Sequence, residues 1–211
     1  MTLTADTRHK RVPELGGKDF DTACAILDAA RICHVGFTLE GQTYVVPMAC
    51  ARRGAELLLH GSIASRLMKH TGGGSPVCVT VTHLDGLVFA RSAFHSSMNY
   101  RSVMIFGRAR AVTDKAEKQA GLDALVEHLM PGRLAEIRDS TRKELNATTL
   151  LTLPIEVFTT KVRTGPPDEP TADIHDPVWA GVVPFTLQAG APEDAPDLDE
   201  GYPPPEYLSR L

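Results

Sequence analysis

The sequence predicts a mainly β domain with flanking helices (α+β), in which the strands are antiparallel. Three observations lead to this fold class. Short strand-like runs follow one another at residues 33–39, 43–50, 56–60, 77–82, 87–90 and 101–112. Turn residues separate the first three runs, and two helical segments interrupt the series. Short strands at this spacing are typical of an antiparallel barrel or sandwich and not of a parallel doubly wound sheet.

Length and composition limit the possible functions. The chain has 211 residues, 43% hydrophobic and 23% charged, which suits one globular domain with a real core. A net charge of −4 without a basic run predicts no nucleic-acid partner, because phosphate binding needs a concentrated basic surface. No apolar run approaches the ~20 residues of a membrane span, and the N-terminus lacks a signal-peptide pattern. We therefore expect a cytoplasmic protein without a membrane partner. Its cysteines form no C-x-x-C pair and are expected to be reduced and mostly buried.

The first helix is predicted over residues 19–32. Asp19 is a suitable N-cap, and apolar residues then recur at helical spacing. A second helix is predicted over 62–70, where the glycine run 72–74 ends it.

The third helix is predicted to open at Asp114. Glu117 stands three residues later, a spacing that resembles a capping box. A short polar helix is expected over 141–146, and two late strands over 148–153 and 157–162.

We divide the chain into three parts. Residues 1–18 are a polar N-terminal arm, and residues 19–185 form the main folded domain. Residues 186–211 are an acidic, proline-rich tail, which we expect to be extended, docked on a partner surface or partly disordered.

The central strand poses a question about its surroundings. Residues 103–106 are apolar at every position, whereas a strand with one wet face should alternate apolar and polar residues. A lone small barrel cannot cover both faces of such a strand. We therefore expect a homodimer in which a second copy covers the other face.

A phosphate cradle is predicted where the strand at 56–59 runs into a helix start. Helix N-termini offer free N–H groups and a positive dipole end. Arg66 and Lys69 are three residues apart and share one helix face, although a solvated helix face is the competing interpretation. The cradle residues are Gly61, Ser62, Ser65, Arg66 and Lys69.

His60 stands at the end of that strand, beside the cradle. Its competing interpretation is a hydrogen-bonded structural histidine. His34, His83 and His95 lie in or near the strands and would permit a metal or haem site, although no pair has a recognised ligand spacing. The nucleophile motif G-x-S-x-G is absent, so a hydrolase has little support.

Four stretches together resemble a known family. GQTYVVPMAC, LLLHGSIASRLMKH, PVCVTVTHLDGLVFARSAF and NYRSVMIFGRARAV occur in the order and spacing of the FMN-binding split β-barrel proteins related to pyridoxamine 5′-phosphate oxidase. The nearest branch contains the 5-nitroimidazole reductases (Nim-type proteins). The resemblance covers about residues 10–185. It implies a homodimeric, antiparallel split β-barrel with FMN between the two subunits.

The resemblance also implies roles for particular residues. Ser65 and Arg66 occupy the place of the Ser-Arg pair that holds the FMN phosphate, and Lys69 stands two positions beyond the family's lysine, which is Leu67 here. His60 aligns with a histidine near the flavin and is the predicted catalytic residue. The remaining cofactor-binding residues lie on two strands: Val46, Pro47 and Met48 along the ring, and Asn99, Tyr100, Arg101 and Ser102 at its border.

The implied function is an FMN-dependent oxidoreductase that reduces a small nitro- or quinone-like electrophile. NAD(P)H would bind transiently over the flavin, because no G-x-G-x-x-G motif is present. The C-terminal Trp and Arg motif for pyridoxamine phosphate is not visible, so vitamin B6 phosphate is not the expected substrate. The alternative function is a flavin- or haem-binding split-barrel protein without turnover, serving as a sensor or carrier.

Overall fold

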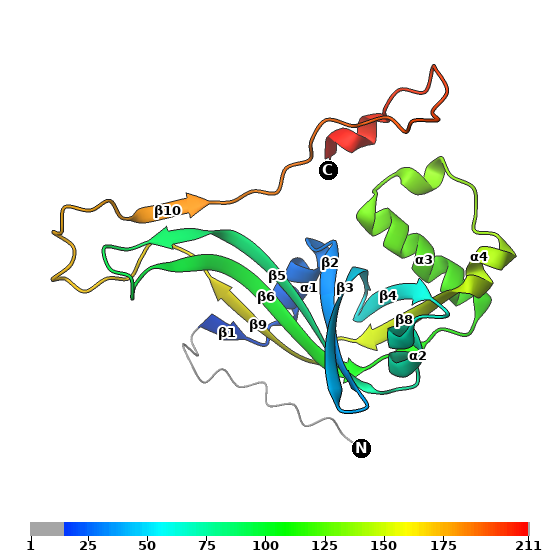
Figure 1. The fold of residues 1–211 in the computed structure, drawn as a ribbon, viewed down its shortest axis with the longest axis horizontal. Coiled ribbons are helices and arrows are strands. Elements are labelled where there is room, and N and C mark those ends of the chain that lie inside the picture. Colours follow the sequence, from blue (N-terminus) through cyan, green and yellow to red (C-terminus); the bar gives the residue numbers. More distant parts are fainter. Residues whose placement is uncertain (1–14, 211) are drawn as a thin grey trace.

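The computed structural model describes residues 15–210 as one antiparallel sheet, curled into a half-barrel and flanked by helices (Figure 1). The strands are β1 Gly16–Gly17, β2 Ile32–Leu39, β3 Gln42–Arg53, β4 Glu56–Ser62, β5 Pro76–Phe89, β6 Ser97–Arg108, β7 Arg110–Ala111, β8 Thr148–Pro154, β9 Val157–Arg163 and β10 Gly181–Pro184. The helices are α1 Phe20–Asp28, α2 Arg66–Gly72, α3 Lys115–Leu129 and α4 Arg142–Ala147, with short 3-10 turns at η2 Arg133–Ala135 and η3 Glu206–Arg210. The predicted fold class is confirmed. Most of the predicted N-terminal arm, residues 1–14, lies outside the described residues.

The half-barrel is one continuous sheet in which β6 and β7 lie at different places in the strand order. The order is β1-β9-β6-β5-β2-β3-β4-β8-β7, and β10 pairs with β5 outside this path. The sequence predicted a single strand at 101–112, but the path breaks at Ala109 between β6 and β7. The break allows β6 to pair with β5 and β9, whereas β7 pairs with β8.

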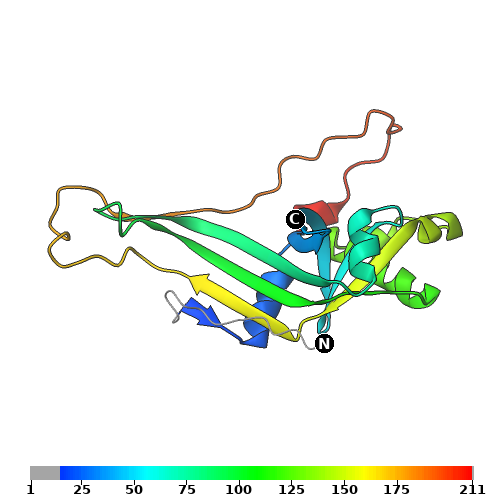
Figure 2. The same ribbon diagram turned by 60° about the horizontal axis from the view of Figure 1, so that its bottom comes forward.

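A long arm projects from the barrel. The two predicted strands at 77–82 and 87–90 are one continuous strand, β5, with a bulge at Asp85. Figures 1 and 2 show β5 and β6 running together beyond the barrel, with β10 alongside β5. We call residues 84–89, 97–100 and β10 the arm. The segment between β9 and β10 runs out to the arm's tip and turns back there (Figure 1).

The first two helices differ from their predicted bounds. Asp19 caps α1 by accepting a 2.7 Å hydrogen bond from the Thr22 N–H, as predicted, but α1 ends at Asp28 because the chain enters β2 at Ile32. The second helix was predicted to begin at 62. Instead Ser62 is still paired in β4, and α2 begins at Arg66.

The later helices follow their capping residues. Asp114 accepts from the Glu117 N–H at 2.8 Å, but the Glu117 carboxylate binds Arg110 at 2.8 Å instead of completing a capping box. The short helix α4 carries the complete capping box, between Thr141 and Glu144. This helix was predicted at the same place.

The core has two parts. The larger fills the half-barrel and includes Val103 and Ile105 of β6, and the smaller lies beneath α3. All four cysteines are free, and all but the half-buried Cys78 are buried, as predicted. None of the described helices is long and apolar enough to span a membrane.

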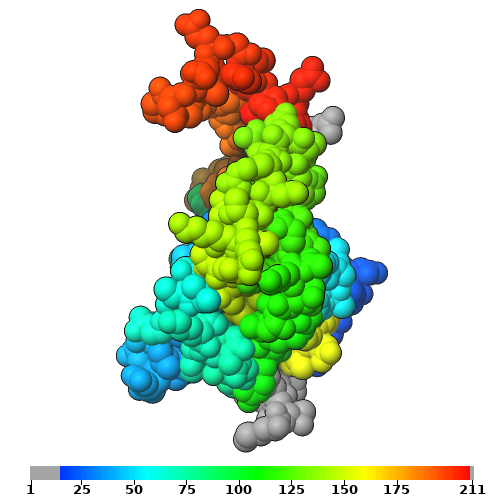
Figure 3. All heavy atoms as spheres, turned by 90° about the vertical axis from the view of Figure 1, so that its right-hand side faces the viewer, coloured from blue at the N-terminus to red at the C-terminus, as the bar shows by residue number. Residues whose placement is uncertain are grey.

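The C-terminal tail ends on its own chain. The Tyr207 hydroxyl donates to the Glu136 carboxylate at 2.6 Å and accepts from Arg133 at 3.3 Å. Figure 3 shows this end of the chain, in red, against the residues that follow α3. The tail was predicted to be extended, docked on a partner surface or partly disordered. Its last turn docks on η2 of its own chain.

Candidate functional site

The predicted phosphate cradle lies where β4 passes into α2. A Cβ added to Gly61 would stand 3.0 Å from the Met68 side chain, so the end of β4 packs directly against this helix. Ser65 is the N-cap of α2, and its hydroxyl accepts from the Met68 N–H at 3.4 Å. Since α2 has only seven residues, the cradle depends on its side chains and not on a helix terminus.

Two cations stand together on α2. Arg66 and Lys69 are both exposed, and the Arg66 guanidinium lies 4.8 Å from the centre of the Tyr44 ring. Within the described residues neither cation has a carboxylate partner. The Tyr44 ring in turn stacks on Phe37 at 5.3 Å. This arrangement leaves two uncompensated positive charges beside an aromatic surface, which suits a phosphate carried by a ring-containing ligand.

His60 carries an unsatisfied polar atom. The ring is half-buried near the end of β4, opposite Leu150 of β8, and its Nδ1 is buried without a hydrogen-bond partner in the described chain. Burial lowers the pKa of His60, so the ring is neutral at pH 7. A buried ring nitrogen without a partner is uncommon and marks a place where a missing group would bond.

The predicted flavin-lining residues of β3 point to opposite sides of the sheet. Pro47 is exposed, whereas Val46 and Met48 pack against the barrel core. This division is the ordinary alternation of a β-strand. Of these three residues only Pro47 therefore presents its side chain on the exposed side of the sheet.

The polar residues at the start of the central strand bind their own chain. Arg101 forms a two-pronged ion pair with Asp85, with N–O distances of 2.9 and 2.8 Å. This contact lowers the pKa of Asp85. Asn99 donates to the Gly165 carbonyl at 3.1 Å, and the Ser102 hydroxyl donates to the Lys161 carbonyl at 3.3 Å. These contacts hold the base of the arm.

The structure separates the two predicted halves of the site. Arg66 lies over the ring of Tyr44 in β3, and Tyr44 pairs with Phe37 of β2. One residue earlier in β2, Gly36 pairs with Cys78 of β5, which in turn pairs with Phe106 of β6. Arg66 is therefore level with Phe106 across the sheet. Arg101 is five residues from Phe106 along β6, about 17 Å at the rise of a strand. The cradle residues therefore lie together where β4 passes into α2, and the group 99–102 lies elsewhere in the same chain. His60 is next to Gly61 along β4, but it points to the opposite side of the strand, with Leu150 and the core beneath α3. The flavin contacts predicted for 99–102 stay a prediction.

A groove on the exposed side of the sheet was missed by the sequence analysis. We call the exposed side of β2, β3, β5 and β6 the outer face. The groove measures about 460 Å³, within the range of ligand sites. Its lining is Gly36, Phe37, Thr38, Thr43, Pro76, Val77, Cys78 and Phe106. The signal that could have found it is the alternation along β2, in which His34, Gly36 and Thr38 are the outward positions.

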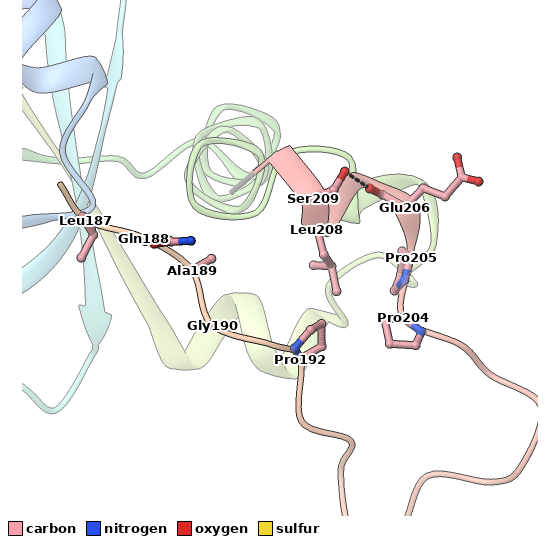
Figure 4. A pocket seen from close by; sticks show the side chains of 10 residues that line it. All are labelled: Leu187, Gln188, Ala189, Gly190, Pro192, Pro204, Pro205, Glu206, Leu208 and Ser209. Atoms are coloured by element: carbon pink, nitrogen blue, oxygen red, sulfur yellow. Dashed lines mark hydrogen bonds between the residues drawn. The ribbon is translucent and has the colours of Figure 1, made fainter.

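A cavity in the tail offers no chemistry. Its volume is about 610 Å³. Figure 4 shows its lining, which comes from residues 187–192 and 204–209. Glu206 is its one titratable side chain in the described chain, and the rest of the lining is mostly proline and small apolar residues. We therefore place the candidate site at the cradle, His60 and the outer face.

Comparisons with known proteins concern the family and the fold. The family described as "Pyridoxamine 5′-phosphate oxidase" matches residues 19–162. The FAD and haem binding protein from Mycobacterium smegmatis is similar with a TM-score of 0.89 and 39% identity, covering 93% of this chain and 96% of that one. The flavocytochrome Anf3 from Azotobacter vinelandii is similar with a TM-score of 0.92 and 40% identity, covering 98% and 97%.

A third similarity concerns the fold alone. A structure described as a candidate 5-nitroimidazole antibiotic resistance protein from Bacteroides thetaiotaomicron has a TM-score of 0.58 and 24% identity, covering 70% of this chain and 86% of that one. No curated protein matches the sequence.

Proposed function

The chain belongs to the pyridoxamine 5′-phosphate oxidase family, and from that premise we propose that it is a flavin-binding redox protein. Two relatives that cover nearly the whole chain support a flavin, since one is described as binding FAD and haem and the other as a flavocytochrome. One observation of this structure carries the proposal. The unsatisfied Nδ1 of His60 stands on the same β4–α2 segment as two uncompensated cations, Arg66 and Lys69.

The residues present fit a flavin nucleotide. Arg66 and Lys69 would neutralise its phosphate, and the hydroxyls of Ser62 and Ser65 would donate hydrogen bonds to the phosphate oxygens. His60 is neutral, so its Nδ1 can hold or accept a proton beside the ring or a substrate. When bound, the flavin supplies hydride and single-electron transfer.

We favour FAD over FMN as the cofactor. The resemblance in the sequence implied FMN, whereas the relative from Mycobacterium smegmatis is described as an FAD protein. The cradle offers cations for one phosphate, which FMN and FAD both supply. Affinities of the apoprotein for FAD, FMN and riboflavin therefore separate three outcomes. Tighter binding of FAD supports the proposal, and tighter binding of FMN supports the cofactor implied by the sequence resemblance. Riboflavin binding as tight as that of FAD and FMN contradicts a phosphate site at the cradle.

The reaction that we propose is the reduction of a small nitro- or quinone-like electrophile, with NAD(P)H as a transient donor. The groove on the outer face would accept such a molecule. Steady oxidation of NAD(P)H in the presence of a nitro compound or quinone would support this reaction. A stable flavin spectrum without NAD(P)H oxidation would favour the alternative, a carrier or sensor without turnover.

Haem is a second cofactor that one observation favours. Within the described chain, His70, His83 and His128 each bond a main-chain carbonyl through Nε2, at 2.9, 2.9 and 2.5 Å. His34 has no such partner there and is exposed on the outer face, with Pro47 and Thr80 beside it in the strand register. An unengaged imidazole on an apolar surface fits an iron ligand.

The haem proposal is tested by spectroscopy. Added haem should give a sharp Soret band with the wild type, and His34→Ala should lose or shift that band. His95→Ala is the matched control, since His95 makes a ring contact with Phe94 but no hydrogen bond in the described chain. A wild type that binds no haem, or an unchanged band in His34→Ala, would contradict this assignment.

A further inference from the structure

The ring of Tyr44 is held in place by the barrel. Tyr44 lies near the start of β3 and is directly opposite Phe37 of β2 in the strand register. The two rings stack, with their centroids 5.3 Å apart and an angle of 20° between their planes. Phe37 is 5% exposed and belongs to the larger core, so it gives the half-buried Tyr44 ring a fixed support.

Arg66 meets this ring from α2. The central carbon of its guanidinium lies 4.8 Å from the centre of the Tyr44 ring, within the ~6 Å reach of a cation–π contact. Within the described residues, neither a carboxylate nor another hydrogen-bond acceptor engages the Arg66 side chain. Arg66 is also the first residue of α2, where the helix dipole does not favour a cation. The Tyr44 ring is therefore the contact that decides where this charge stands.

The helix α2 and the hairpin of β2 and β3 are joined at a second point. His70 follows Arg66 by four residues, so the two side chains lie on the same side of α2. The His70 Nε2 bonds the Thr38 carbonyl at 2.9 Å, and the His70 ring lies 5.8 Å from the Phe37 ring. Contacts one helical turn apart fix the position of α2 relative to the hairpin. Arg66 and Tyr44 therefore meet in the protein before any ligand binds.

The contact with the ring leaves the donors of Arg66 available. A cation–π contact uses the charge of the guanidinium, and no oxygen of the described chain occupies its five N–H groups. Fixing a mobile side chain on binding costs conformational entropy, and a contact that exists before binding reduces this cost. Lys69 has no ring contact of this kind in the described chain, so its side chain must be ordered when a ligand binds.

We propose that Tyr44 is a positioning residue for phosphate recognition, and that it determines how strongly the chain prefers a flavin nucleotide to riboflavin. This role rests on the proposed flavin site, in which Arg66 meets the phosphate. Tyr44 acts through its ring and not through its hydroxyl. The ring contacts Arg66 and Phe37, whereas the hydroxyl makes no hydrogen bond within the described chain.

Flavin affinities of the full chain test this role. FMN and riboflavin differ by the phosphate alone. Tyr44→Leu removes the ring and should weaken FMN binding by about twofold to fivefold, the range expected for an exposed cation–π contact, with riboflavin affinity unchanged. Tyr44→Phe keeps the ring and should retain the FMN affinity of the wild type. Phe20→Leu is the matched control, since it removes a 38% exposed ring on α1, 6.1 Å from Phe158, and should change neither affinity.

Two further measurements connect Tyr44 to Arg66. In the Arg66→Ala background, Tyr44→Leu should cause no further loss of FMN affinity, because the two residues act as one unit. In nuclear magnetic resonance spectra of the apoprotein, the Arg66 side-chain N–H signal is identified by its absence in Arg66→Ala. The ring current of Tyr44 should move this signal upfield in the wild type and in Tyr44→Phe, but not in Tyr44→Leu. Circular dichroism checks that each variant is folded.

The outcomes separate this role from the proposed cofactor site. If Arg66→Ala weakens FMN binding but Tyr44→Leu does not, the role of Tyr44 is overturned and the phosphate site stands. Equal losses for FMN and riboflavin in Tyr44→Leu, or a loss of FMN affinity in Tyr44→Phe, would also overturn it. An Arg66 signal without an upfield shift in the wild type would overturn it without any variant at Tyr44. A wild type that binds riboflavin as tightly as FMN would overturn the phosphate site itself and this role with it.

Discussion

The barrel and the arm share the strands β5 and β6 but are stabilised differently. Within the barrel, β6 places Val103 and Ile105 in a core where both are almost fully buried. The same strand carries Asn99 in the arm and Arg101 at the arm's base, where the first forms a hydrogen bond and the second an ion pair. The barrel can therefore fold on its own apolar burial, whereas the arm depends on polar contacts on one side and leaves its apolar side open. The difference places most of the fold's apolar burial in the barrel and leaves the arm with an open apolar side.

The largest expected effect tests the barrel's core. Ile105→Ala removes a side chain with no exposed surface and should lower the free energy of unfolding by about 2–5 kcal/mol. Met98→Ala on the arm is the matched control on the same strand and should cost less than about 1 kcal/mol when the chain is monomeric, because Met98 is half-exposed. Urea denaturation at low protein concentration measures both. Equal losses would contradict the division between barrel and arm.

Cofactor binding should respond to the cations of the cradle, which lie on the barrel. Arg66→Ala should weaken FAD or FMN binding by about 1.5–3 kcal/mol, a tenfold to hundredfold loss, with little change for riboflavin. Lys69→Ala tests whether the second cation shares the phosphate. Titrations at one fixed salt concentration give the affinities, since salt screens charged contacts. Leu87→Lys is the control on the arm. Its flavin affinity is compared with that of the wild type at a protein concentration at which the two have the same molecular mass in solution.

A smaller effect is expected at the base of the arm. Asp85→Asn removes the charge that pairs with Arg101 and should cost at most about 1 kcal/mol, because both side chains are partly exposed. The pKa of Asp85 is lowered in the folded chain, so its contribution is present above the ordinary carboxyl pKa and is lost as the pH falls through the lowered value. Amide hydrogen exchange should show faster opening of the arm than of the barrel. Unchanged exchange along the arm would show that the ion pair does not hold the bulge.

The smallest expected effect is a pH dependence at His60. Burial lowers the pKa of His60 in the folded state, so the unfolded chain takes up the proton first as the pH falls. Stability should therefore decrease as the pH falls through the ordinary histidine pKa and should not change on this account at higher pH. His60→Gln should flatten this part of the stability profile. A slope that persists in His60→Gln would assign the effect to another group.

Several local features were predictable from the sequence because neighbouring residues determine them. Asp19 and Asp114 each cap the helix that follows, through a side chain that reaches a main-chain N–H three residues on. The start of β8 at Thr148 followed from the β-branched and apolar run there. The predicted helix at 62–70 was wrong at its start, because Ser62 pairs with Thr148, a residue far away in the chain.

The candidate site was predictable in part. Arg66 and Lys69 share one side of α2 because residues three apart in a helix are neighbours, and the spacing alone indicated it. The partner of Arg101 could not be read from spacing, since Asp85 reaches it only through the bulge in β5. The outward direction of Met104 was equally open, because residues 103–106 are apolar throughout and give no alternation.

The sequence by itself determined where most strands and helices form, since hydrophobic period and capping act within a few residues. The tertiary structure decided which side of each strand faces water, because that depends on register with partners far along the chain. The single extra residue at Asp85 illustrates this dependence. The bulge does not interrupt β5, but it turns Leu87 to the same side as Met104 and so continues the exposed apolar side of the sheet along the arm.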